Sequence, residues 1–345
     1  MGVSALNSHK PCRILLILTG GTICSFADES GERRSDVEMA EALIVRHFRE
    51  GGSPVRGEDA VQFDCRRPLD VLSENMTVDC WNTLIRDLKC CDFSQYDGVI
   101  LLHGTDTLAY TASLLALLMA GTPIPVMLVS AILPIYMPDS NGDQNFRAAV
   151  ELIAKGIAPD VYAVYRNDDG VTYLHKGAHL LQCAHDSVNF YSADMVAAEE
   201  LDGESCPRPT DVDMPLYRVG NLTDCVLCIT PHVGLNYGCF SLDGVKAVLH
   251  GTYHSSTAEV AGLLSLKARC DREEVPVPVF LSHCDARAYA YESTGALLRA
   301  GVRPSHGMTD EMTYVKLLVG CAMGRASDDL EQYLQVEVNR EFIGK

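Results

Sequence analysis

Two short polar turns, each directly after an apolar run, carry the residues best suited to chemistry. Thr-Gly-Gly-Thr at 19–22 follows the run 14–18, and His-Gly-Thr-Asp-Thr at 103–107 follows the run 99–102. Glycines at strand ends let backbone N–H groups approach an anion or an oxyanion closely. Each turn also places threonine hydroxyls beside those donors. Together the two turns predict a hydroxyl-rich site for a small polar ligand.

A threonine hydroxyl in such a site becomes a good nucleophile only when a base removes its proton. Asp106 adjoins Thr105 and can orient and polarise a neighbouring group. A carboxylate of ordinary pKa is nevertheless a weak base at neutral pH. A lysine or tyrosine partner is therefore expected, and the two turns contain neither. The residues indicate hydrolysis with an unidentified base. Nucleotide binding is not indicated, because the chain has no GxGxxG and no Walker lysine.

The elements that must position these turns follow from the short apolar runs along the chain. Buried strands separated by helices indicate a parallel sheet covered on both faces. Ligands of such sheets bind beyond the carboxyl ends of the strands, where both turns are expected to lie. The predicted strands are 14–18, 99–102, 126–129, 225–230, 246–249 and 277–281, and the predicted helices are 108–119, 146–153, 258–269 and 309–323.

The composition changes around 203–218, where three prolines and scattered charges occur together. This segment predicts an interdomain linker at 204–218. The chain then divides into an N-terminal domain at 1–203 and a smaller C-terminal α/β domain at 219–345.

Charge and composition exclude several classes of function. Asp and Glu number 46 against 28 Lys and Arg, a formal net charge of −18 that argues against a nucleic-acid partner. No apolar segment has the about 18 residues of a membrane helix, so no membrane partner is expected. Many of the 14 cysteines lie in apolar runs, which indicates buried thiols and a cytoplasmic location. Cys225 and Cys228 form a lone CxxC, so no metal site is expected.

Three motifs resemble the L-asparaginase family of bacterial type. They are ILLILTGGTI at 14–23, LSENMT at 72–77 and YDGVILLHGTDTLAYTAS at 96–113. The resemblance is greatest to the cytoplasmic type I branch and to the related tRNA-dependent amidotransferase subunit. It implies a larger N-terminal flavodoxin-like domain, a smaller C-terminal α/β domain, no cofactor, and a homodimer or homotetramer. The implied reaction hydrolyses L-asparagine to L-aspartate and ammonia.

The resemblance also assigns roles to residues of the first two turns. Thr22 matches the nucleophile that forms an acyl-enzyme with the substrate side chain. Thr105 and Asp106 match the second catalytic element, and Asp106 would also bind the substrate α-amino group. Backbone N–H groups at Gly21 and Gly104 would stabilise the oxyanion.

Three further positions would complete the substrate pocket. Ser73 matches the serine that holds the substrate α-carboxylate, and Glu74 lies beside it. Ala131 follows the strand where the family places a backbone carbonyl against the amide nitrogen of the substrate.

Other positions depart from the family. Glu32 follows Gly31 where the family has a tyrosine, and Gln182 stands at the position of the lysine that pairs with the Thr-Asp element. Glutamine neither takes nor gives a proton at ordinary pH. A family asparagine in the second domain becomes Thr257.

These departures leave two hypotheses open. In the first, the protein is an active hydrolase whose base is His175, Lys176, His179 or another residue of the same segment. In the second, it keeps the pocket but has lost asparaginase chemistry. It would then be a ligand sensor, a regulatory subunit, or an enzyme for a different amide.

Overall fold

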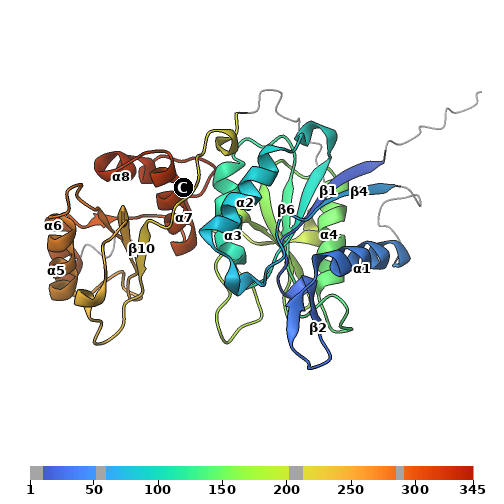
Figure 1. The fold of residues 1–345 in the computed structure, drawn as a ribbon, viewed down its shortest axis with the longest axis horizontal. Helices are drawn as coiled ribbons and strands as arrows, with labels where there is room; N and C mark the ends of the chain where they lie inside the picture. The colour runs from blue at the N-terminus through green and yellow to red at the C-terminus, as the bar shows by residue number, and fades with distance from the viewer. Residues whose placement is uncertain (1–10, 52–59, 202–212, 285–290, 345) are drawn as a thin grey trace, which may run out of the picture.

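The computed structural model describes residues 11–51, 60–201, 213–284 and 291–344. It is an α/β structure with a larger sheet in the N-terminal part and a smaller sheet in the C-terminal part (Figure 1). The larger sheet has the strand order β4-β1-β5-β6-β7-β8-β9. The first five strands in this order are parallel, whereas β8 pairs antiparallel with β7 and β9 pairs antiparallel with β8. Its strands are β1 (Cys12–Leu18), β4 (Val61–Arg66), β5 (Gly98–Leu102), β6 (Val126–Val129), β7 (Val161–Arg166), β8 (Thr172–Lys176) and β9 (Val196–Ala197).

Helices cover both faces of this sheet, which explains why its central strands are apolar without alternation. In β1, Leu15 and Ile17 pack toward α2 (Val78–Lys89) and α3 (Leu108–Leu118). Ile14 and Leu16 point to the other face, toward α1 (Val37–Glu50) and α4 (Gly142–Ala154). A small hairpin of β2 (Ser25–Ala27) and β3 (Arg33–Ser35) follows the first turn. The predicted flavodoxin-like parallel sheet is thus confirmed.

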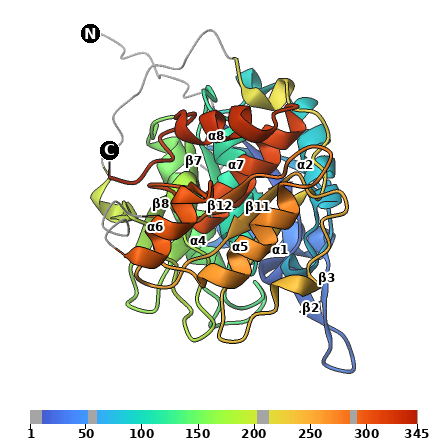
Figure 2. The same ribbon diagram turned by 90° about the vertical axis from the view of Figure 1, so that its left-hand side faces the viewer.

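The second sheet has the order β10-β11-β12-β13, and all of its pairs are parallel. Its strands are β10 (Val226–Ile229), β11 (Ala247–His250), β12 (Val279–Leu281) and β13 (Arg303–Pro304). The outer face carries α5 (Val260–Cys270) and α6 (Glu292–Arg299), which lie nearest the viewer in Figure 2. The inner face carries α7 (Asp310–Ala322) and α8 (Ser327–Gln335).

Helix α7 packs against α3, so the inner face of the second sheet shares one hydrophobic core with the first domain. This contact explains why α3 is apolar on nearly every side. Most of the predicted linker 204–218 falls outside the described residues. Its last part, Pro215–Tyr217, forms one helical turn that contacts α2 and α3. Among the described residues, no helix has the length and apolarity needed to cross a membrane.

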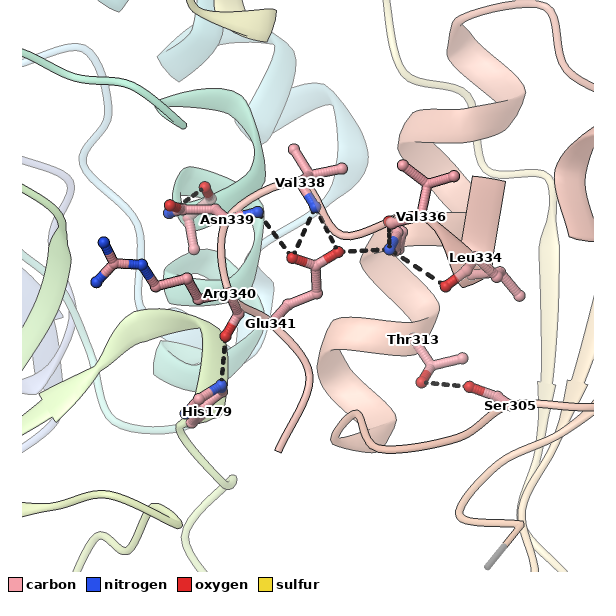
Figure 3. A network of polar contacts seen from close by, with 11 residues as sticks. His179, Ser305, Thr313, Leu334, Val336, Val338, Asn339, Arg340 and Glu341 are labelled. Carbon is pink, nitrogen blue, oxygen red and sulfur yellow. Dashed lines mark hydrogen bonds and ion pairs between the residues drawn. The ribbon is translucent and has the colours of Figure 1, made fainter. Parts of the chain in front are cut away.

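The chain returns to the first domain after α8 through residues 336–344, here called the C-terminal strap (Figure 3). The Lys316 side chain on α7 is fully buried, and its Nζ donates to Glu341 Oε1 at 2.5 Å. The same ammonium donates to the backbone carbonyls of Leu334 and Val336 at 3.2 and 2.6 Å. A buried charge is tolerated only with such a complete set of partners.

Hydrogen bonds attach this strap to the first domain, among them one from Asn339 Nδ2 to Asp160 Oδ1 at 3.0 Å. Asn339 Nδ2 donates to the carbonyl of Ala116 in α3 at 2.9 Å. His179 Nε2 lies 2.7 Å from the carbonyl of Arg340 (Figure 3). The strap therefore fixes α7 and the first domain relative to each other through hydrogen bonds as well as through the shared core.

Candidate active site

The two glycine-containing turns meet at the carboxyl edge of the larger sheet. Gly20 and Gly21, directly after β1, have φ angles of +107° and +81°, in the region that favours glycine. A Cβ added to Gly21 would lie 2.2 Å from the Cα of Gly104, which directly follows β5 and His103. Backbone therefore contacts backbone between the two turns. The N–H of Gly21 donates to the carbonyl of Val71 at 2.8 Å. Because this donor already has an acceptor, Gly21 contributes the close approach of the two turns rather than a free N–H.

Ser73 brings a third turn to the same place. Its hydroxyl donates to Asp106 Oδ2 at 2.9 Å and accepts the Asp106 backbone N–H at 3.2 Å. Its carbonyl accepts a hydrogen bond from Thr107 Oγ1 at 3.0 Å. Ser73 is buried, and a Cβ on Gly104 would lie 2.3 Å from its Oγ. These contacts orient the Asp106 carboxylate, which remains exposed to solvent.

The other predicted positions lie around these turns. Thr22 begins a single helical turn, Thr22–Cys24, and is half-buried like Thr105. Glu74 is exposed beside Ser73. Ala131 is fully buried just beyond the carboxyl end of β6. Strands β1, β5 and β6 are neighbours in the sheet, so the turns that follow them occupy one edge.

A buried hydrogen-bond chain supports the HGTDT turn from below. His103 Nδ1 lies 2.8 Å from the carbonyl of Gly104, and its Nε2 lies 2.9 Å from Thr111 Oγ1. Trp81 Nε1 donates to the same hydroxyl at 3.1 Å. Burial lowers the pKa of His103 to about 4, so the ring is neutral at neutral pH. No sequence pattern indicated this support, because nothing in the sequence pairs Trp81 with Thr111.

Gln182, which the resemblance aligns with the lysine, lies against the HGTDT turn. Its Nε2 donates to the carbonyl of Thr105 at 2.9 Å, and its Oε1 accepts the N–H of Ala109 at 3.4 Å. The backbone N–H of Gln182 donates to Glu311 Oε1 at 3.1 Å. Burial raises the pKa of this carboxyl group. Glu311 lies in the first turn of α7, so the second domain helps to hold the turn, a role with no signal in the sequence.

The three alternative bases have partners elsewhere. Strand β8 runs antiparallel to β7, so its last residues lie at the opposite edge of the sheet from the two turns. Lys176 Nζ lies 3.0 Å from an Asp194 oxygen, and His179 Nδ1 lies 3.0 Å from the other. His175 contacts a serine hydroxyl, and burial lowers the pKa of its ring to about 4. Within the part of the chain that the structure describes, no hydrogen bond or ion pair joins any of the three to Thr105.

Glu32 lies at the exposed tip of the β2–β3 hairpin. Its carboxylate is 3.5 Å from Arg34, and its N–H donates to Asp28. The tyrosine that the structure does place against this hairpin is Tyr136, whose ring stacks on Phe26 at 5.3 Å. Its position after β6 was not recognised from the sequence.

The position of the substituted asparagine lies outside the first domain. Thr257 is in the loop between β11 and α5, and its carbonyl accepts the N–H of Tyr253 at 2.8 Å. Across the described residues, no group of three His, Cys, Asp or Glu side chains is arranged to hold a metal ion.

Comparisons with known proteins identify the family of the chain. The family model described as "Asparaginase, N-terminal" matches residues 13–203. An L-asparaginase of Thermococcus kodakarensis is 28% identical over 343 residues, which cover 96% of this chain and 99% of that protein. The solved structure of the thermostable L-asparaginase from the same organism has a TM-score of 0.75 at 25% identity, covering 96% and 100% of the two chains.

A second relative, a subunit of an amidotransferase, matches along nearly the whole chain. A glutamyl-tRNA(Gln) amidotransferase subunit of Methanobrevibacter smithii is 25% identical over 365 residues, covering 98% of this chain and 79% of that protein. The matched family region contains both glycine turns, Ser73 and Gln182. The family model, the full-length relative and the shared fold show that the chain belongs to the asparaginase family of amidohydrolases.

Proposed function

We propose that the protein hydrolyses the side-chain amide of a small amino acid, with L-asparagine as the first candidate. The observation that carries the proposal is the backbone contact between the turns of Thr22 and Thr105, with Ser73 orienting Asp106 beside them. Thr22 Oγ1 would attack the amide carbon, ammonia would leave, and water would hydrolyse the resulting ester. Ser73, Glu74 and Asp106 would bind the amino-acid end.

The proton transfers of this reaction need a base and an acid, and the lysine of the family is replaced by Gln182. Gln182 instead uses its carboxamide to hold Thr105 and Ala109. This contact favours a second candidate function, in which the pocket binds an amino-acid-like ligand or a different amide without rapid asparagine turnover. A lysine at this position would take up a proton as the amine and give it back as the ammonium. We therefore expect the wild-type protein to be slow and Gln182→Lys to be faster.

The test is ammonia release from L-asparagine and L-glutamine by the wild type, Thr22→Ala and Gln182→Lys. Slow release that disappears in Thr22→Ala and increases in Gln182→Lys supports the hydrolase. A wild type without release, whose melting temperature rises with asparagine that is not consumed, supports the binding function. Release that persists in Thr22→Ala would show that another residue is the nucleophile.

The remaining expectations belong to the same proposal. The net charge of −18 disfavours a tRNA substrate, a polyanion. A homodimer or homotetramer in the cytoplasm fits the type I resemblance, and light scattering after size-exclusion chromatography measures the assembly directly.

A further inference from the structure

A groove lies between the two domains, beside the candidate active site. Its volume is about 810 Å³, within the range of pockets that hold small organic molecules. The first domain contributes the starts of α2 and α3, and the second domain contributes β10 and α7. Thr107, which bonds to the Ser73 carbonyl, is one of the lining residues, so the groove opens next to the HGTDT turn.

The wall of this interdomain groove is aromatic. Trp81, Tyr110 and Tyr314 all line it, and the two tyrosine rings meet edge to face with centroids 5.9 Å apart. Met76 and Val226 add apolar surface. An apolar molecule with an aromatic or alkyl body would bury its surface against these side chains.

The charges at this groove are of one sign. Asp79 and Asp224 line it and are both exposed, and no lysine or arginine is among the described residues of its lining. Asp310 and Glu311, in the first turn of α7, add negative charge near Tyr110. Cations bind favourably over aromatic rings, and carboxylates beside the rings strengthen this attraction. An anion would meet repulsion from these carboxylates.

From the groove, its aromatic wall and its acidic rim, we propose that this protein binds a small organic cation between its domains. The ligand carries an ammonium or quaternary ammonium group near Asp79 and Asp224, and its apolar body lies against Trp81, Tyr110 and Tyr314. The groove is separate from the amide-hydrolysis proposal, because its lining includes neither Thr22 nor Thr105.

Trp81 is the only tryptophan of the chain, so intrinsic fluorescence reports on this groove directly. We would titrate the full-length protein with 2-phenylethylammonium, with the neutral 2-phenylethanol and with the anion phenylacetate. The expected result is a saturable change in Trp81 emission with the cation and at least tenfold weaker binding of the other two probes. Equal binding of the alcohol, or no saturable change with the cation, would overturn the proposal.

Matched variants locate the site. Asp79→Asn combined with Asp224→Asn removes the two lining charges without changing the side-chain shape, and we expect at least tenfold weaker binding of the cation. Glu274→Gln, an exposed acid on the loop after α5, should bind it as the wild type does. Retention of full affinity in the double variant would refute the site. If none of the probes changes Trp81 emission but dilution of an oligomer does, the groove is a subunit interface and the proposal is wrong.

Discussion

The buried pair of Lys316 and Glu341 makes a sharp stability prediction. Both side chains have 0% exposure, and the ammonium also serves two backbone carbonyls. Lys316→Met removes the cation and leaves a buried carboxylate without its counter-charge. Breaking a buried pair in this way costs about 3–5 kcal/mol. The free energy of unfolding should fall by that amount, because the strap cannot easily hydrate Glu341 while it remains attached to α3.

Urea unfolding at pH 7, followed by Trp81 fluorescence and far-UV circular dichroism, measures this loss. With a slope of about 3 kcal/mol per molar, the midpoint should fall by about 1–1.7 M. Lys267→Met is the matched control, because Lys267 pairs with Asp271 four residues later at a partly exposed position. That pair is worth about 0.3–0.5 kcal/mol, so the control should shift the midpoint by less than about 0.2 M.

A second variant separates the buried charge from the lost packing. In the wild type, the N–H groups of Val338 and Asn339 donate to the Glu341 carboxylate. The double variant Lys316→Met with Glu341→Gln removes both charges but keeps an amide oxygen as the acceptor for these N–H groups. It should be more stable than Lys316→Met alone, because no charge remains buried without a partner. The reasoning is refuted if Lys316→Met leaves the midpoint within about 0.3 M of the wild type. A double variant less stable than Lys316→Met would refute it as well.

The pH dependence of the same pair has a definite sign. Burial alone would raise the pKa of Glu341, but Lys316 and the strap N–H groups outweigh burial and lower it below 4.5. A lowered folded-state pKa contributes stability above the unfolded value and loses it as the pH falls. The stability difference between wild type and Lys316→Met should therefore narrow below about pH 4.5.

Two further predictions concern the glycine turn and the strap. Gly21→Ala should lower the free energy of unfolding in urea by more than about 2 kcal/mol, because a Cβ would meet the Gly104 backbone. Gly31 has a similar φ, but a Cβ there would meet no other atom, so Gly31→Ala should cost only about 1–2 kcal/mol. Equal losses of stability in the two variants would contradict the proposed clash between a Cβ at position 21 and the Gly104 backbone. Burial opposes charging of His179, but Asp194 and a strap carbonyl outweigh it and raise its pKa above 6.5. The melting-temperature advantage of wild type over His179→Gln should thus shrink as the pH rises above 6.5; a constant gap would contradict this.

The extent of one predicted strand depended on a missing backbone donor as well as on its apolar run. The segment 277–281 was predicted as a strand, whereas β12 begins at Val279. Pro278 has no N–H for a ladder hydrogen bond, although its carbonyl accepts the N–H of Val248. The helix predicted at 146–153, in contrast, begins earlier than predicted, at Gly142, because its first turn is polar and gives no apolar signal.

Sequence alone determined the most apolar strands and helices and the polar turns of this protein. A continuous apolar run indicates a strand buried on both faces, and glycines after such runs indicate close backbone approach, so local chemistry was sufficient for the two turns. Gln182 was identified as a departure only through the resemblance to the family. The family resemblance rested on these same local motifs.

Only the tertiary structure decided which distant side chains meet. Glu311 reaches the N–H of Gln182 across 129 positions, and Asn339 reaches Ala116 across 223. Such pairs depend on the angle at which α7 packs against α3, which no periodicity within either helix specifies. The same packing creates the interdomain groove. The physical reason is that a local pattern shows which face of an element is buried, whereas the partner of that face is set by the arrangement of the whole core.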